Sequence, residues 1–134
     1  MVSLSPCLMI DSVASDAIVR YPKAFPRAEV LQRSEYESGD FEMAGKVRSA
    51  TLSLYGCLVR IIDSPVVHGF AFTPAVSLYV EIADESDLFQ AYEVLAERGT
   101  VLLAIDTYPH SPNYGWITDR FGVSWQLSQP DASI

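Results

Sequence analysis

The order of strand-like and helix-like segments in the first half of this chain is repeated in its second half. In the first half, one strand-like segment precedes a helical pattern and three strand-like segments follow it. These segments are residues 4–10 (strand), 14–25 (helix), 28–35, 47–54 and 57–62 (strands). Pro22 is expected to shorten or kink the helix, because proline lacks the N–H of a helical hydrogen bond. The first half is therefore expected to form a βαβββ module.

The second half follows residues 63–74, a proline- and glycine-containing segment that we expect to be a linker. Asp84 is expected to cap its helix, and Gly99 to end that helix with a positive φ. The predicted strands are residues 76–82, 100–105, 115–118 and 123–128, with a proline-rich loop at 108–113. The repeat predicts two modules, at about residues 4–64 and 75–129, and an α+β fold with a curved mixed sheet.

Composition and charge exclude several classes of function. With 134 residues, 49% of them hydrophobic, the chain suits one compact domain. Its net charge of −8 leaves no basic surface for nucleic acid, and no apolar run is long enough to span a bilayer. The start of the chain lacks the basic residues of a signal peptide. We therefore expect a cytoplasmic protein with neither a nucleic-acid nor a membrane partner.

Glycine spacing excludes two kinds of cofactor site. Dinucleotides and methyl donors approach the backbone at glycine-rich G-x-G turns. No two of the seven glycines here are closer than six positions. The chain therefore offers no such turn.

Polar residues share one side of two strands in the second module. Ser77, Tyr79 and Glu81 alternate with apolar residues, and Gln126 does so in the last strand. Successive side chains of a strand point to opposite faces. The apolar sides are therefore expected to pack on the helices, and the polar sides to face solvent or a cleft.

Two segments resemble one protein family. Residues 21–30 (YPKAFPRAEV) and, more specifically, residues 115–126 (GWITDRFGVSWQ) are similar to PhnB-like proteins. These belong to the vicinal oxygen chelate superfamily, with glyoxalase I, bleomycin-resistance proteins and dioxygenases. The resemblance covers about residues 4–129. It implies two βαβββ modules whose curved sheets enclose a cleft, and a homodimer to which Phe70 and Phe72 can contribute.

The resemblance also points to four positions where metal-dependent relatives hold an ion, with His on the first strands and Glu on the last. The matching residues here are Ser5, Arg60, Ser77 and Gln126. A hard divalent cation needs carboxylate or imidazole ligands, and a guanidinium repels it. His68 and His110 are expected to be exposed in loops. We therefore expect no metal and no other cofactor.

The residues expected to bind a ligand are Arg60, Ser77, Tyr79, Glu81, Gln126 and Trp116. Arg60 either supplies positive charge for an anionic or polar ligand or pairs with Glu81, and both readings stay open. Trp116 is equally open between ligand stacking and packing, whereas Trp125 is expected in the core. Cys7 is expected to be a small buried residue. No catalytic residue is identified.

We consider two main hypotheses for the function of this protein. The first is a metal-free protein that binds a small organic molecule of unknown identity. The alternative is an enzyme of the glyoxalase or dioxygenase type, a lyase or isomerase, with a non-standard site. The missing His and Glu ligands favour the first. A dimeric structural protein with a vestigial cleft is a weaker third hypothesis.

Overall fold

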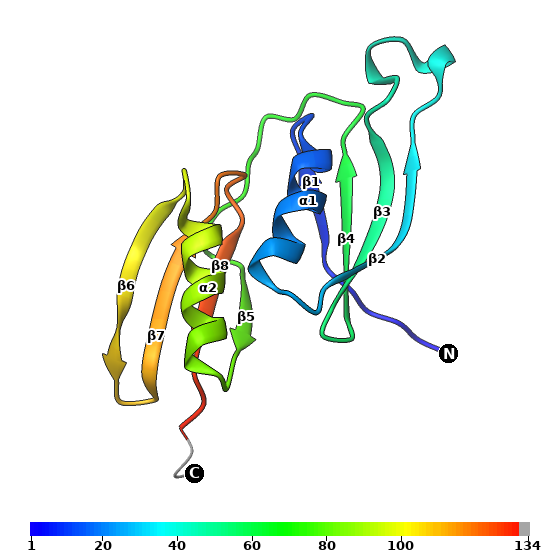
Figure 1. Cartoon of the computed structure of the whole chain (residues 1–134). Coiled ribbons are helices and arrows are strands. Elements are labelled where there is room, and N and C mark those ends of the chain that lie inside the picture. The colour runs from blue at the N-terminus through cyan, green and yellow to red at the C-terminus, as the bar shows by residue number, and fades with distance from the viewer. Residues whose placement is uncertain (132–134) are drawn as a thin grey trace. The chain divides into compact units, whose positions relative to one another are not determined.

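The structure, a computed structural model, describes residues 1–131 and divides into two compact units (Figure 1). The first unit ends at Gly69 and the second begins at Phe70. Each unit packs one α-helix against a four-stranded sheet whose first and last strands are parallel. The predicted α+β fold of two βαβββ modules is therefore confirmed.

The first unit contains four strands, one α-helix and one 3-10 helix. Their bounds are β1 Cys7–Ile10, α1 Ala14–Ala24, β2 Glu29–Glu35, η1 Ser38–Met43, β3 Val47–Leu54 and β4 Cys57–Asp63. The sheet has the order β1-β4-β3-β2, and α1 packs against β3 and β4. Pro22 does not end α1, which runs to Ala24; beyond it, the Phe25 N–H donates to the Tyr21 carbonyl at 2.9 Å.

The second unit has the same topology. Its elements are β5 Ser77–Glu81, α2 Glu85–Ala96, β6 Thr100–Tyr108, β7 Ser111–Thr118 and β8 Ser124–Ser128. The sheet order is β5-β8-β7-β6, and α2 packs against β7 and β8. The predicted cap is confirmed, because Asp84 Oδ1 accepts a hydrogen bond from the Asp87 N–H at 2.9 Å.

Three local predictions are wrong. The loop expected at residues 108–113 is mostly strand, since Tyr108 of β6 pairs with Ser111 of β7 across a two-residue turn. The positive φ after α2 belongs to Arg98, at 59°, and not to Gly99. Gly99 is needed for a different reason, because a Cβ there would overlap the Thr118 carbonyl oxygen of β7. Cys7 is exposed, because it alternates in β1 with the buried Leu8.

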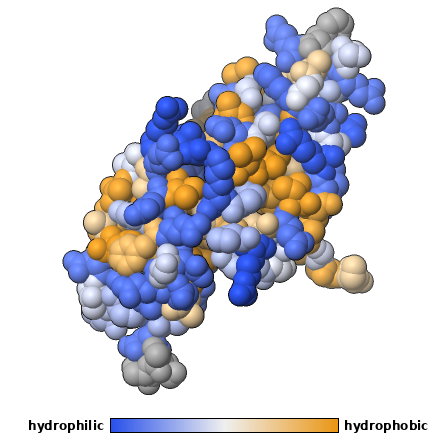
Figure 2. All heavy atoms as spheres, in the orientation of Figure 1, coloured by the Kyte–Doolittle hydropathy of each residue, from blue (hydrophilic) through white to orange (hydrophobic). Residues whose placement is uncertain are grey.

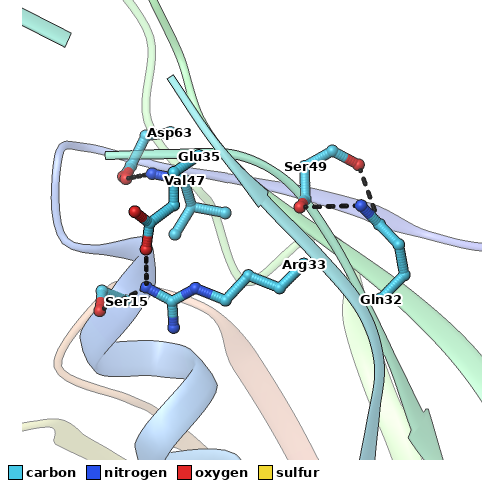
Figure 3. Close-up of polar contacts among 7 residues, drawn as sticks. All are labelled: Ser15, Gln32, Arg33, Glu35, Val47, Ser49 and Asp63. Atoms are coloured by element: carbon cyan, nitrogen blue, oxygen red, sulfur yellow. Dashed lines mark hydrogen bonds and ion pairs between the residues drawn. The ribbon is translucent and has the colours of Figure 1, made fainter. Parts of the chain in front are cut away.

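A buried carboxylate joins helix to sheet in the first unit. The Asp63 side chain, 1% exposed at the end of β4, accepts hydrogen bonds from the Ala14 N–H at 2.9 Å and the Val47 N–H at 3.0 Å. Figure 3 shows the bond to Val47 beside the contacts of Arg33 with Ser15 and Glu35. Ala14 begins α1, so Asp63 satisfies an N–H that the helix cannot pair internally.

Asp119 has the corresponding role in the hairpin between β7 and β8. Its Oδ1 accepts from the Phe121 N–H at 2.9 Å and the Val123 N–H at 3.0 Å, and its Oδ2 accepts from Trp125 Nε1 at 2.9 Å. Gly122, with φ +91°, completes the turn. Trp125 is 0% exposed, which confirms that it belongs to the core.

Some apolar side chains remain at the surface. Figure 2 shows apolar atoms on the visible face of both units, and the exposed side chains include Leu31 and Leu58 in the first unit and Val101, Leu103 and Phe70 in the second. The homodimer stays a prediction.

Among the residues that the structure describes, no helix is long and apolar enough to cross a bilayer.

We expect Asp119→Asn to lower the free energy of unfolding by about 2–3 kcal/mol, because an amide N–H would face groups that can only donate. Urea denaturation followed by far-UV circular dichroism measures this loss. The control is Glu93→Gln, which removes a carboxylate at an exposed position of α2 and should change stability by less than about 0.5 kcal/mol. Equal stability of the two variants would contradict the assigned role of Asp119.

Candidate functional site

The polar face of the second sheet is built from three rows of residues. Each row crosses β5, β8 and β7 in that order: Ser77, Ser124 and Thr118; Tyr79, Gln126 and Trp116; Glu81, Ser128 and Tyr114. The other side of the sheet carries Gly115, where a Cβ would lie 3.2 Å from the Tyr92 ring of α2, and the buried Trp125. The three rows therefore face away from α2, as the alternation predicted.

The first row forms a chain of hydrogen bonds that reaches into the second. Trp116 Nε1 donates to Ser124 Oγ at 2.8 Å, and Ser124 Oγ lies 2.6 Å from Ser77 Oγ. Trp116 is half-buried, and its indole N–H is occupied. The bond fixes the indole ring on the polar face, so the ring can contact a ligand there without searching other rotamers.

The second row places an amide between two aromatic residues. Gln126 on β8 has Tyr79 beside it on β5 and Trp116 beside it on β7. Tyr79 is 51% exposed, whereas Gln126 and Trp116 are half-buried. Gln126 Oε1 accepts a hydrogen bond of 2.6 Å from the Tyr114 hydroxyl of the third row.

Tyr114, in the third row of the same face, is only 6% exposed. Its ring packs edge to face with Tyr108 at 5.4 Å and with His110 at 4.9 Å between ring centroids. Burial, and then the neighbouring Tyr79 and Tyr108 side chains, raise the pKa of the Tyr114 hydroxyl above its ordinary value of 10.0. Tyr114 is therefore protonated, and able to donate, throughout the physiological range.

Arg60 lies in the other unit. It is exposed on β4, beside Cys7 of β1 and Thr51 of β3, and its backbone N–H donates to the Pro6 carbonyl at 2.9 Å. Five of the six predicted ligand residues therefore share the second sheet, and Arg60 belongs to the first. A role for Arg60 at the same ligand, or a pairing with Glu81, stays a prediction.

The residues that the resemblance places at metal positions, Ser5, Arg60, Ser77 and Gln126, lack the carboxylate and imidazole groups that a divalent cation prefers. Ser77 is hydrogen-bonded to Ser124, Gln126 accepts from Tyr114, and Arg60 carries a positive charge. Over residues 1–131, no group of three or more His, Cys, Asp or Glu side chains could hold a metal ion. His68 and His110 are exposed, as predicted, and His68 Nε2 lies 2.8 Å from Ser64 Oγ.

Sequence reasoning missed Tyr114. Its position fell between the predicted loop at 108–113 and the predicted strand at 115–118, so it was assigned to neither face. Extending the alternation two residues back from Trp116 places Tyr114 on the same side. Its hydrogen bond to Gln126 depends on the pairing of β7 with β8, which the sequence pattern does not contain.

Comparison with known proteins agrees with this architecture. The family model described as 3-demethylubiquinone-9 3-methyltransferase matches residues 2–128. The chain belongs to this family. An uncharacterized Mycobacterium bovis protein is 31% identical over 136 residues, covering 96% of this chain and 83% of the relative. The family description names a methyl transfer, but the glycine spacing provides no methyl-donor turn in these 134 residues.

Solved structures confirm the recognition of a PhnB-like fold within the vicinal oxygen chelate superfamily. A Bacillus cereus structure described as a PhnB protein is 36% identical, covers 96% of this chain and 99% of its own, and has a TM-score of 0.87. The fosfomycin resistance protein FosX of Listeria monocytogenes, complexed with Mn(II) and a dihydroxypropylphosphonic acid, shares the fold at 11% identity. That match covers 99% of this chain and 96% of FosX, with a TM-score of 0.66.

Tyr114 is expected to make stability fall in alkaline solution. The unfolded chain loses the Tyr114 proton near the ordinary pKa of 10.0, before the folded protein does. The free energy of unfolding therefore decreases as the pH rises above about 10. Urea denaturation at pH values from about 8.5 to about 11 should show a steeper decrease for the unmodified protein than for Tyr114→Phe. Parallel curves would show that Tyr114 is not the responsible group.

Proposed function

We propose that this protein binds a small organic molecule on the polar face of its second sheet without the help of a metal ion. The observation that carries this proposal is the row in which Tyr79 and Trp116 flank Gln126. Tyr79 and Trp116 lie on strands that are two strand spacings, about 9.5 Å, apart, with Gln126 on the strand between them. Aromatic faces supply contact area and an amide supplies directional hydrogen bonds, a combination typical of small-molecule sites.

The metal-free part of the proposal rests on donor chemistry. The resemblance matches Ser77 and Gln126 to positions where metal-dependent relatives carry His and Glu, and the side-chain oxygens of both residues already have partners within the protein. The first unit presents Arg60 at the position equivalent to Gln126. A guanidinium repels a metal cation, so this substitution also argues against a bound metal.

Ligand binding is tested by recording ¹H–¹⁵N spectra while a library of planar and non-planar metabolites is added. Trp116 and Trp125 lie on opposite faces of one sheet, so their indole N–H signals distinguish the polar face from the helix side. A ligand of the polar face should shift the Trp116 signal and leave the Trp125 signal in place. Tyr79→Ala should weaken such a ligand about five- to tenfold.

The matched control is Phe89→Ala, which removes another exposed aromatic ring, from α2, and should leave affinity unchanged. Arg60→Glu should weaken anionic ligands more than neutral ones if Arg60 acts at the same ligand. Ligands that bind but never shift the Trp116 signal would overturn the placement on the polar face.

Metal content is tested by elemental analysis of protein purified without chelators or added metal. We expect less than about 0.1 equivalent of nickel, zinc, iron or manganese, because hydroxyl, amide and guanidinium groups are poor ligands for these ions. A stoichiometric metal that Gln126→Ala removes would overturn the metal-free proposal. It would favour the alternative, an enzyme of the glyoxalase or dioxygenase type.

A further inference from the structure

The amide of Gln126 can present either of two chemistries to a ligand. Its oxygen accepts hydrogen bonds and its nitrogen donates two, so rotation of the amide by about 180° exchanges acceptor for donor. The Tyr114 hydroxyl decides between these orientations. It donates to Gln126 Oε1 at 2.6 Å, and a neutral phenol is a much better donor than acceptor.

The surroundings of Tyr114 keep this direction of donation fixed. The residue is 6% exposed, with the Tyr108 and His110 rings packed edge to face against its own. Burial raises the pKa of its hydroxyl, so the proton that Gln126 Oε1 accepts is retained at neutral pH. The amide oxygen is thus engaged by Tyr114, and the amide nitrogen is the end that can donate to a ligand.

We propose that Tyr114 is a positioning residue that turns Gln126 into a hydrogen-bond donor toward the ligand, so that the polar face selects planar molecules with an uncharged acceptor, such as a carbonyl group, at their edge. This proposal rests on the proposed function. It adds the chemical class of ligand that the Tyr79, Gln126 and Trp116 row recognises.

The charge of the second unit favours an uncharged acceptor over a carboxylate at this row. Glu81 lies on the same face, two residues along β5 from Tyr79. Arg98 and Arg120, the basic residues of the second unit's sequence, lie in turns at the ends of α2 and β7, and Arg120 contacts Glu97 at 3.5 Å. A carboxylate bound at Gln126 would approach Glu81 with no cation on the same three strands, whereas a carbonyl avoids this repulsion.

The other donor of this row is already occupied. Trp116 Nε1 donates to Ser124 Oγ, so the indole contributes its ring face but not its N–H. A planar ligand that packs on this ring face meets Gln126 Nε2 at its edge. An acceptor there gains a hydrogen bond, whereas a donor would oppose another donor, which costs affinity in a partly desolvated site.

The test compares two planar bicyclic probes of similar size. Coumarin carries a carbonyl acceptor and no N–H, and indole carries an N–H donor and no acceptor atom in the ring plane. Titrations followed by ¹H–¹⁵N spectra give both affinities and show whether the Gln126 side-chain NH₂ signals move. We expect coumarin to bind about five- to tenfold more tightly than indole, and to shift the Gln126 NH₂ signals.

Three variants separate the positioning role from simple packing. Tyr114→Phe keeps the buried ring but frees the amide to rotate, so both probes should still bind and their affinities should converge to within about twofold. Tyr92→Phe removes a hydroxyl on α2, at the opposite side of the sheet, and should keep the preference. Gln126→Glu leaves only acceptor atoms, so the preference should reverse in favour of indole.

The outcomes distinguish this inference from the proposed function. If both probes bind with the Trp116 signal shifting but with equal affinity, or if Tyr114→Phe keeps the preference for coumarin, the positioning role is wrong and the binding face stands. If neither probe shifts the Trp116 signal at millimolar concentration, the binding of planar ligands at this row is wrong, and the inference fails with it.

Discussion

The carboxylate of Asp119 is the constraint on which the second unit depends. Its two oxygens accept three N–H groups, two from the hairpin backbone and one from Trp125. These bonds hold the loop in which β7 turns into β8 and anchor the largest core side chain to that loop. The three rows of the polar face exist only in the register that this hairpin sets, because a slip by one residue would turn every side chain to the other face.

Asp63 is the buried carboxylate of the first unit, and it accepts hydrogen bonds from different backbone N–H groups. There a carboxylate at the end of the last strand pairs with the first N–H of α1 and with the start of β3. Both units thus place a buried, acceptor-only group where backbone N–H groups lack partners within their own elements. In the second unit the polar side of the sheet has separate hydrogen bonds of its own among Ser77, Ser124 and Trp116.

The fold was largely predictable because its signals are local. Hydrophobic alternation and the helix cap at Asp84 are each carried by a few neighbouring residues, and the structure retains them. The candidate site was predictable in composition but not in connectivity. Strand parity assigned Gln126 to the polar side and left Trp116 open between stacking and packing, whereas the bond from Tyr114 to Gln126 depends on how two strands align. The role of Gly99 was misassigned for a similar reason. Glycine is required there because the Thr118 carbonyl oxygen of β7 leaves no space for a Cβ, and not because the preceding helix needs a positive φ.

Gly115 brings the helix side of the second sheet close to its polar face. The absent side chain lets the Tyr92 ring of α2 and the Ile105 side chain of β6 approach the backbone of β7, where a Cβ would lie 3.2 Å from the ring and 2.8 Å from the isoleucine. Trp116 is the next residue along, on the opposite side of the same peptide. The sheet is therefore only one backbone thick between helix and indole, and a larger residue at position 115 would have to displace Tyr92 or Ile105 or the strand that carries Trp116.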